Sequence, residues 1–558
     1  MRPTPTARHL TAAAIFLAVS VLFGYLAMHE TRISDRQAHL ATAALKEHDG
    51  ALFTHDPVYG RSGLWQVDLP IFQSLLKLSL VPSGYRDVVL PFRLMTGIVA
   101  LVYLCGMYAL LFQQCRSWSV SAFVAVGSAA VFEAIPGLKW GFGSLATTEP
   151  ETLCLAVLPM ILLAYLRYEH QVRVIWVFAA IGMLGNLDLS VAMNLTLVLS
   201  GVYLVRHHFT WRAVGTAALG AMAALLAALP TLSYVVWLRA TMSGAGGADY
   251  DLAQAALATF DPDLLYPRVL TKLLNWHVLV MLTVLGIPSI LVLVRVERFR
   301  VRHQSVWVWL MILAIVVGFG FHGLSQAVGK VLDRPPPILE FFSALKLVMV
   351  PLFVLAAQAL TNVFRLAPRQ RALLQSVGLV AIVAWLAPSE NLRVARYSIW
   401  ETGTSFLEEA RKPTSVLRHR RRAARHKERE AVAAWARTRS KGDAVFLTDD
   451  IVFRMASRRS ILVSDKDMWY YYYLAPTQLP RWNQRVQGQA ALLNWPAGRA
   501  DPDMIAKTIE ALSDQGDFET VSEWYVLLEH ESHLDSAGGL TPIESEGWGT
   551  YYRLFRVR

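Results

Sequence analysis

The sequence predicts an α-helical membrane protein with about eleven transmembrane helices, a large first external loop and a C-terminal α/β soluble domain. Of its 558 residues, 54% are hydrophobic and only 17% are charged, a composition outside the usual range of soluble proteins. Apolar stretches long enough to cross a hydrocarbon core recur from residue 10 to residue 388. From about residue 443 they give way to short strand and helix patterns. Together these observations predict a membrane bundle followed by a soluble domain.

The first apolar stretch, residues 10–28, has no small-residue cleavage site and is followed by a polar segment, so we expect a retained anchor. Further spans are expected near 88–112, 119–136, 150–166, 174–190, 191–205, 213–238, 276–295, 305–322, 338–363 and 372–388. The Lys- and Arg-rich loops between them alternate with longer loops that are poorer in these residues, which places the basic loops in the cytoplasm. An odd number of spans then places segment 29–87 and everything after residue 388 outside the plasma membrane, here expected to be bacterial.

Five parts follow from this pattern. They are an N-terminal anchor (1–28), an external loop with candidate catalytic acids (29–87), a multi-helix bundle (88–388), a basic juxtamembrane helix or linker (389–442) and an extracytoplasmic α/β domain (443–558). The run "RHRRRAARHKERE", residues 418–430, disagrees with an external location, but long translocated domains largely escape the charge rule. We expect this helix to lie on lipid headgroups, and we expect no nucleic-acid partner despite the net charge of +11.

The C-terminal part has the pattern of a small α/β domain. "DAVFLTD", "RSILVSD", "WYVLLEH" and "YYRLFRV" predict strands, and "DPDMIAKTIEALSDQ" predicts a helix. It contains no glycine-rich phosphate loop, no zinc-type Cys/His spacing and no nucleophile elbow. The domain therefore carries no motif that would assign a reaction by itself.

A single span, a large acidic external loop, a many-helix body and an external α/β domain together resemble the C-type fold of membrane glycosyltransferases. The strings "HDPVYG" and "FRMASRRSILVSDKDMWYYYYLAPTQLPRWNQRV" also look like those of bacterial multi-pass proteins of this build. The resemblance implies transfer of a sugar from a polyprenyl-phosphate donor to a glycan, lipid or other extracytoplasmic acceptor. It also implies a catalytic carboxylate soon after the first span, where this chain has "HETRISDRQAH" in place of tandem acids or an acid-Tyr pair.

The candidate catalytic acid is Asp35 or, less directly, Asp49 or Asp56. Such a carboxylate would take the proton of an acceptor hydroxyl while a cation or a metal neutralises the departing phosphate. Each acid has a structural alternative: Asp35 suits the first turn of a helix, whereas Asp49-Gly50 and Asp56-Pro57 are turn dipeptides. The candidate donor phosphate-binding residues are Lys330, Arg334, Lys139 and Lys346.

Other candidates for the cavity are His39, His55, Glu149 and Glu151. The two glutamates flank Pro150 at the mouth of a span, which is also good helix-capping chemistry. No definite cofactor is predicted; if a divalent metal is used, a histidine with Asp35 or Asp56 would supply its ligands, although unpaired surface histidines are commoner. Two other functions compete with the enzyme: a transporter or flippase for a lipid-linked or small substrate, and a non-catalytic envelope assembly protein.

Overall fold

The computed structural model describes residues 5–60, 63–67, 70–135, 138–140, 148–242, 250–260, 303–336, 340–366, 385–492, 520–529, 540–544 and 547–557, with positions 285, 286, 290, 376, 380, 383, 505, 507–509 and 518. Within these residues, seven helical segments are long and apolar enough to cross a membrane. They are α1 (Pro5–Met28), α4 (Leu90–Cys115), α6 (Pro150–Tyr168), α8 (Leu189–Arg206), α9 (Trp211–Met242), the segment of α14 (Gln304–Ile315), η6 (Val316–Phe321) and α15 (His322–Val331), and the segment of η7 (Glu340–Val348) and α16 (Met349–Leu366).

Two shorter apolar helices, α5 (Trp118–Gly127) and α7 (Val174–Leu184), complete the described bundle. The protein is thus a helical multi-span membrane protein. The expected spans at 276–295 and 372–388 lie outside the described residues, apart from isolated positions.

Two of the expected spans are too long. The span expected at 119–136 ends as α5 at Gly127, and the chain then forms the antiparallel strands β1 (Phe132–Ile135) and β2 (Leu138–Trp140). The span expected at 174–190 ends as α7 at Leu184, because Asp188 caps the next helix by accepting from the N–H groups of Ser190 and Val191. Apolar composition alone did not mark either end.

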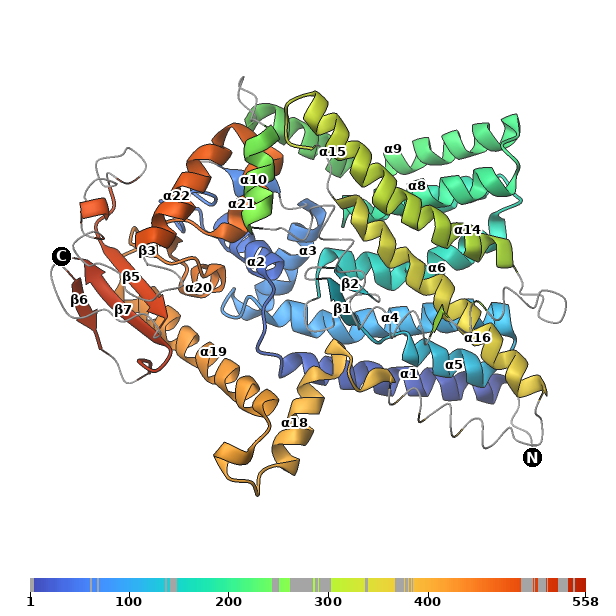
Figure 1. Ribbon diagram of the computed structural model, residues 1–558, viewed down its shortest axis with the longest axis horizontal. Coiled ribbons are helices and arrows are strands. Elements are labelled where there is room, and N and C mark those ends of the chain that lie inside the picture. Colours follow the sequence, from blue (N-terminus) through green and yellow to red (C-terminus); the bar gives the residue numbers. More distant parts are fainter. Residues whose placement is uncertain are drawn as a thin grey trace.

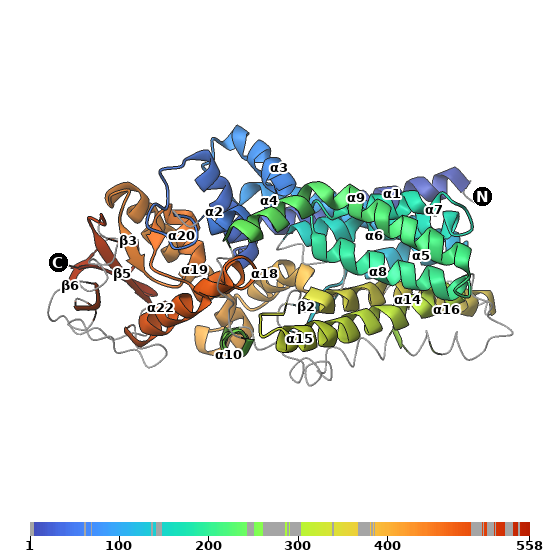
Figure 2. The same cartoon turned by 90° about the horizontal axis from the view of Figure 1, so that it is seen from above.

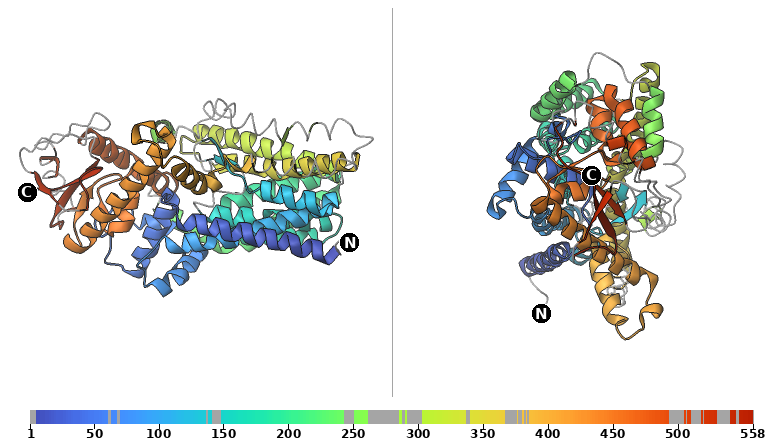
Figure 3. Two further views of the ribbon diagram at one scale, coloured as in Figure 1. Left: turned by 90° about the horizontal axis from the view of Figure 1, so that it is seen from below. Right: turned by 90° about the vertical axis from the view of Figure 1, so that its left-hand side faces the viewer.

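The helices of the bundle run side by side along the long axis of the molecule, and the C-terminal domain covers one end of it (Figures 1 and 2). The N-terminus lies at the opposite end, while segment 29–89 and the region around α10 (Tyr250–Phe260) lie at the end that carries the domain (Figure 3). We call this the domain end. The N-terminus and the first loop therefore lie at opposite ends of the bundle, as expected; the full alternation of loops and the extracytoplasmic location of the domain end stay predictions of the charge pattern.

The first loop folds against the C-terminal domain. It consists of α2 (Asp35–His48), η1 (Leu64–Val67), α3 (Pro70–Leu80) and η2 (Val81–Ser83). Phe53 and Tyr59 of the loop are fully buried in one hydrophobic core with Val445 and Trp482 of the domain. The loop and the domain therefore form a single body, although the sequence separates them by the whole bundle.

The C-terminal domain is built on a five-stranded mixed sheet of order β4-β3-β5-β7-β6. Its strands are β3 (Val445–Leu447), β4 (Ser460–Ile461), β5 (Trp524–Glu529), β6 (Leu540–Ile543) and β7 (Tyr552–Val557). β3 pairs in parallel with β4 and β5, whereas β7 pairs antiparallel with β5 and β6. The four strands expected from the sequence are confirmed, and the helix expected at 501–515 falls largely outside the described residues.

Four helices surround the sheet: α19 (Thr414–Arg439), α20 (Ile451–Ser457), α21 (Met468–Leu474) and α22 (Leu479–Leu492). Helix α19 contains the basic run and is preceded by α18 (Arg393–Gly403). Its C-terminal turns pack Val432 and Ala436 against Phe446 and Tyr525 of the sheet. The basic helix is therefore an integral part of the domain.

Candidate active site

Helix α2 connects the end of the first span to the C-terminal domain. Its start is fixed by a reciprocal capping box: Gln37 donates its backbone N–H to the Ser34 hydroxyl, and the Gln37 side chain accepts from the Ser34 N–H. Three residues in the first turns of this helix reach different surroundings. Asp35 lines an open cavity, Arg36 reaches the mouth of the bundle, and His39 enters a buried polar network.

The cavity beside Asp35, which we call the Asp35 cavity, has a volume of about 400 Å³. Four parts of the chain form it: the residues just after the first span, the basic face of α19, the loops after β3 and β4 with the start of α20, and the ends of β5 and β7. The lining is Thr31, Arg32, Ile33, Asp35, Arg422, Arg425, His426, Arg429, Asp449, Asp450, Ile451, Val452, Asp465, Lys466, Glu529 and Tyr552. Both signs of charge thus meet in one solvent-open space next to the end of α1.

The surroundings of Asp35 raise the pKa of its carboxyl above the ordinary value. Loss of hydration is the largest cause; the positive charge of Lys466 opposes it, and the negative charge of Asp465 adds to it. Lys466 and Asp465 also form an ion pair of 3.1 Å with each other. Asp35 is exposed to the cavity, and with its pKa raised the carboxylate accepts a proton more readily than an aspartate of ordinary pKa.

The arginines of the Asp35 cavity differ in how they are balanced. Arg425 forms an ion pair with Glu529, and Arg429 lies 3.4 Å from a carboxylate oxygen of Asp450. Arg422 is exposed and forms no ion pair with any described residue. Arg422 is therefore the cation of this cavity best able to meet an incoming anion, and Lys466 adds a second positive charge that it shares with Asp465.

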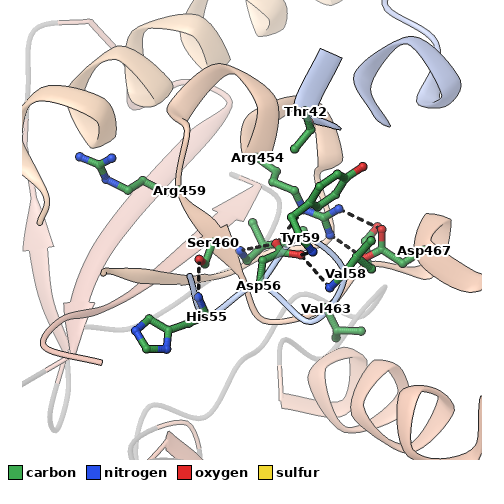
Figure 4. A network of polar contacts seen from close by, with 12 residues as sticks. Thr42, His55, Asp56, Val58, Tyr59, Arg454, Arg459, Ser460, Val463 and Asp467 are labelled. Carbon is green, nitrogen blue, oxygen red and sulfur yellow. Dashed lines mark hydrogen bonds and ion pairs between the residues drawn. The ribbon is translucent and has the colours of Figure 1, made fainter. Parts of the chain in front are cut away.

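Asp56 lies in a closed network between the first loop and the domain (Figure 4). One of its oxygens accepts from the N–H groups of Val58 and Tyr59, and the other accepts from the N–H of Ile461. The second oxygen also lies 3.1 Å from Nε of Arg454. Asp56 is only 2% exposed, so the turn expected at Asp56-Pro57 is present and its carboxylate is fully engaged.

Arg454 joins Asp56 to a second buried carboxylate. It donates both terminal nitrogens to Asp467, at 2.9 and 2.5 Å, and its guanidinium lies 5.2 Å from the centre of the Tyr59 ring (Figure 4). Burial raises the pKa of Asp56, while the charge of Arg454 opposes that rise. Since the arginine and both acids are buried, their charges are stabilised by one another rather than by water.

His39 connects α2 to this network. Its Nδ1 lies 2.9 Å from the Tyr59 hydroxyl and 3.9 Å from a carboxylate oxygen of Asp467. The Tyr59 hydroxyl also lies 3.2 Å from that of Tyr470 on α21. Burial lowers the pKa of His39 to about 4, with the charge of Asp467 acting in the opposite direction, so the imidazole is neutral near pH 7. Within the described residues, no three His, Cys, Asp or Glu side chains are grouped as metal ligands.

A second polar cluster lies where α2 meets the mouth of the bundle. Arg36 forms a 3.2 Å ion pair with Asp188, the cap of α8. Partial loss of hydration alone would lower the pKa of Arg36, which remains exposed, but the charges of Asp188, Glu149 and Glu340 outweigh it and raise the pKa. The cluster therefore holds α2 against the spans by charge.

The remaining candidates of the bundle mouth have partners. Lys346 forms an ion pair with Glu151 and is only 8% exposed, so its charge is already matched. Glu149 is the N-cap residue of α6, and its N–H donates to the Thr152 hydroxyl at 3.4 Å. Glu149 therefore caps the start of α6, as its sequence position indicated.

The other sequence candidates lie apart from the Asp35 cavity. Asp49 ends α2, is exposed, and accepts from the N–H of Ala51. His55 lies about 3.5 Å from the Thr520 hydroxyl, at a different cavity beside α22. Lys330 and Arg334 are exposed at the domain end, where the Tyr250 N–H donates to Asp333 of the same turn. The side chain of Lys139, which lies in β2, falls outside the described residues.

Sequence reasoning missed the groups that surround Asp35 and Asp56. Arg454 comes from "FRMASRRS", and Asp467 and Lys466 come from "VSDKDMW", strings quoted above without a role for their charges. The basic run carried the signal for Arg422, but its charge was attributed to lipid headgroups. Only the folded chain brings these segments next to the first loop.

Comparison with known proteins gives a structural match but no family. No family model matches the sequence, and no curated protein matches it. The crystal structure of ArnT from Cupriavidus metallidurans, bound to undecaprenyl phosphate, is similar to this chain over 97% of both chains. The TM-score is 0.49 and the sequence identity is 13%. The chain thus has a structural match of nearly full length, at a level that bears on neither its substrate nor its site.

Proposed function

We propose that the chain is a membrane glycosyltransferase that moves a sugar from a polyprenyl-phosphate donor to an extracytoplasmic acceptor, with Asp35 as the general base. The observation that carries the proposal is the Asp35 cavity. It combines a carboxylate of raised pKa with the cations Lys466 and Arg422, directly beside the end of the first span. A base and a phosphate-neutralising charge in one space are what this transfer requires.

The reaction balances with these groups. The acceptor hydroxyl forms the new glycosidic bond and gives its proton to Asp35. The bond between the anomeric carbon and the phosphate oxygen breaks, and its electron pair leaves with the polyprenyl phosphate. Lys466 and Arg422 stabilise the negative charge that develops on this leaving group.

The position of the cavity suits a donor anchored in lipid. Thr31, Arg32 and Ile33 line it, and they follow closely after Met28, the last residue of α1. A sugar phosphate on a membrane-embedded chain reaches only groups near the headgroup level. Asp35 meets this condition within the first turn of α2.

The other two acids fit the base role less well. Asp56 is closed in by Arg454 and three backbone N–H groups, so a substrate hydroxyl has no room beside it. Asp49 is exposed at the end of α2 and does not line the Asp35 cavity. We therefore assign Asp56 a structural role under this proposal.

The experiment uses the full chain in lipid nanodiscs with a panel of polyprenyl-phosphate sugars and of lipid and glycan acceptors. Asp35→Asn keeps the size of the side chain but removes the basic oxygen, and we expect the transfer rate to fall on the order of 100 to 10,000-fold. Asp49→Asn is the matched control and should transfer at the wild-type rate. An Asp35→Asn protein that inserts normally and transfers sugar as fast as wild type would eliminate Asp35 as the base. A wild-type chain that transfers none of the sugars would count against the reaction itself.

A further inference from the structure

A second cavity, of about 330 Å³, lies next to the Asp35 cavity, further toward the C-terminal end of α19. It is lined by five arginines, namely Arg86, Arg93, Arg429, Arg437 and Arg458, and by only two acids, Asp87 and Glu430. We call it the arginine cavity. It shares Ile33, His426, Arg429 and Val452 with the Asp35 cavity, so the two spaces adjoin.

The protein balances only part of the positive charge of this cavity. Among the described residues, no ion pair involves Arg86, Arg93, Arg437 or Arg458. Arg93 and Arg458 donate only to neutral backbone carbonyls, those of Glu30 and Tyr85.

Both acids of the lining are already engaged. Asp87 accepts from the N–H groups of Val89 and Leu90 at the start of α4. Glu430 lies 3.2 Å from Nε2 of His426. Five arginines against two acids leave the cavity with a surplus of positive charge, which favours a bound anion.

Three helices and the segment before α4 bring these arginines together. Arg86 precedes α4, Arg93 lies in its first turn, Arg437 lies in the last turn of α19, and Arg458 ends α20. The dipole of α19 accounts for one cation at its C-terminus, but it does not account for the other three. Arg458 also adopts a left-handed backbone conformation, φ 58°, which favours glycine and is strained for a long side chain.

The cavity lies near a lipid surface. Arg93 is in the first turn of a membrane span, and Ile33 follows soon after the end of α1. Guanidinium groups bind phosphate oxygens through paired, charge-assisted hydrogen bonds. From the charge surplus, the cavity and its position beside the ends of two spans, we propose that the arginine cavity binds a phosphate group. This goes beyond the proposed transfer reaction, because the arginine cavity is a separate space and its binding of phosphate can be measured without sugar transfer.

The test compares two charge-matched double variants of the full chain. Arg86→Gln/Arg437→Gln removes two exposed cavity arginines that have no ion-pair partner among the described residues. Arg418→Gln/Arg421→Gln removes two exposed arginines of α19 that line neither cavity. Neither pair is part of the proposed catalytic groups, and unchanged thermal unfolding in detergent would verify that both variants fold.

Two probes separate the sources of the phosphate group. Inorganic phosphate is titrated calorimetrically in neutral detergent, and hexadecyl phosphate is titrated into phosphatidylcholine nanodiscs with detection by native mass spectrometry. We expect the cavity variant to bind at least about tenfold more weakly than wild type, and the control variant to bind like wild type. Binding of both probes supports recognition of the phosphate group itself, and binding of the alkyl phosphate alone supports a lipid headgroup.

Two results would overturn the proposal. The first is a wild-type chain that binds neither probe. The second is equal weakening in the cavity and control variants, since this would mean that net charge rather than the cavity attracts the anion. Either result would leave the Asp35→Asn test of the transfer reaction unaffected.

Discussion

Replacement of Arg454 by methionine is the sharpest test of the buried network. Arg454 is 0% exposed and is the only cation between Asp56 and Asp467 in the described structure. Methionine fills most of the space of the arginine stem, so the change removes the charge and the hydrogen bonds more than the packing. It would leave two buried carboxylates facing each other without the cation that lies between them.

The expected loss in free energy of unfolding is about 3–5 kcal/mol, the range for removing one partner of a buried ion pair. The bidentate contact at 2.9 and 2.5 Å and the second contact at 3.1 Å place Arg454 at the upper end of that range. A surface pair would cost far less, because water replaces the lost partner. The triple variant Arg454→Met/Asp56→Asn/Asp467→Asn should recover part of the loss, since it leaves no buried charge.

The loss should also depend on pH. In wild type, Arg454 opposes the rise in the pKa of Asp56, so its removal lets that pKa rise further above the unfolded value. The folded variant then binds more protons than its unfolded state between these two pKa values. Its stability falls as pH rises through this window, by at most about 1.4 kcal/mol per pH unit for one group. The deficit should therefore be larger at pH 8 than at pH 5.5.

Hydrogen exchange of the amides in α20 and β3, corrected for intrinsic rates, measures the local opening free energy without assuming that the whole chain unfolds in one step. Arg418→Met, an exposed arginine of α19, is the control and should leave these amides unchanged. Exchange in Arg454→Met that matches wild type at pH 8, or a deficit that is the same at both pH values, would refute the assignment of this network.

Two further predictions concern α2. Lys466 lowers and Asp465 raises the pKa of Asp35. The acid limb of the pH–rate profile should therefore move to higher pH in Lys466→Gln and to lower pH in Asp465→Asn. Unchanged profiles would mean that a group other than Asp35 sets the acid limb. Ser34→Ala should destabilise the start of α2 by about 1 kcal/mol, seen as faster exchange of the Gln37 N–H, which donates to the Ser34 hydroxyl; Ser34→Asp should keep the cap and the slow exchange.

Much of the fold was accessible from the sequence because it depends on local pattern. Long apolar runs and alternating basic loops predict spans and their two ends, and short β-branched and aromatic runs predict the strands. The end of α5 was missed because an apolar run such as 119–136 suits both a helix and a strand.

The candidate site was accessible only in part. Asp35 and its helix cap are local features, and so is the turn at Asp56. The partner of Asp56 is not local, because Arg454 comes from the far end of the chain and nothing in "HDPVYG" specifies it. Lys346 was expected to meet a phosphate, whereas the fold places Glu151 beside it.

The same two segments of the chain contribute residues to the buried network and to the Asp35 cavity. Asp35 lies one turn before His39 on α2, and Lys466 lies next to Asp467 in the turn after β4. His39 and Asp467 are 3.9 Å apart inside the network, so the segments that carry Asp35 and Lys466 lie next to each other. A shift of the network would change the pKa of the carboxylate and the reach of its neighbouring cation together. The network therefore positions the two groups on which the proposed transfer depends.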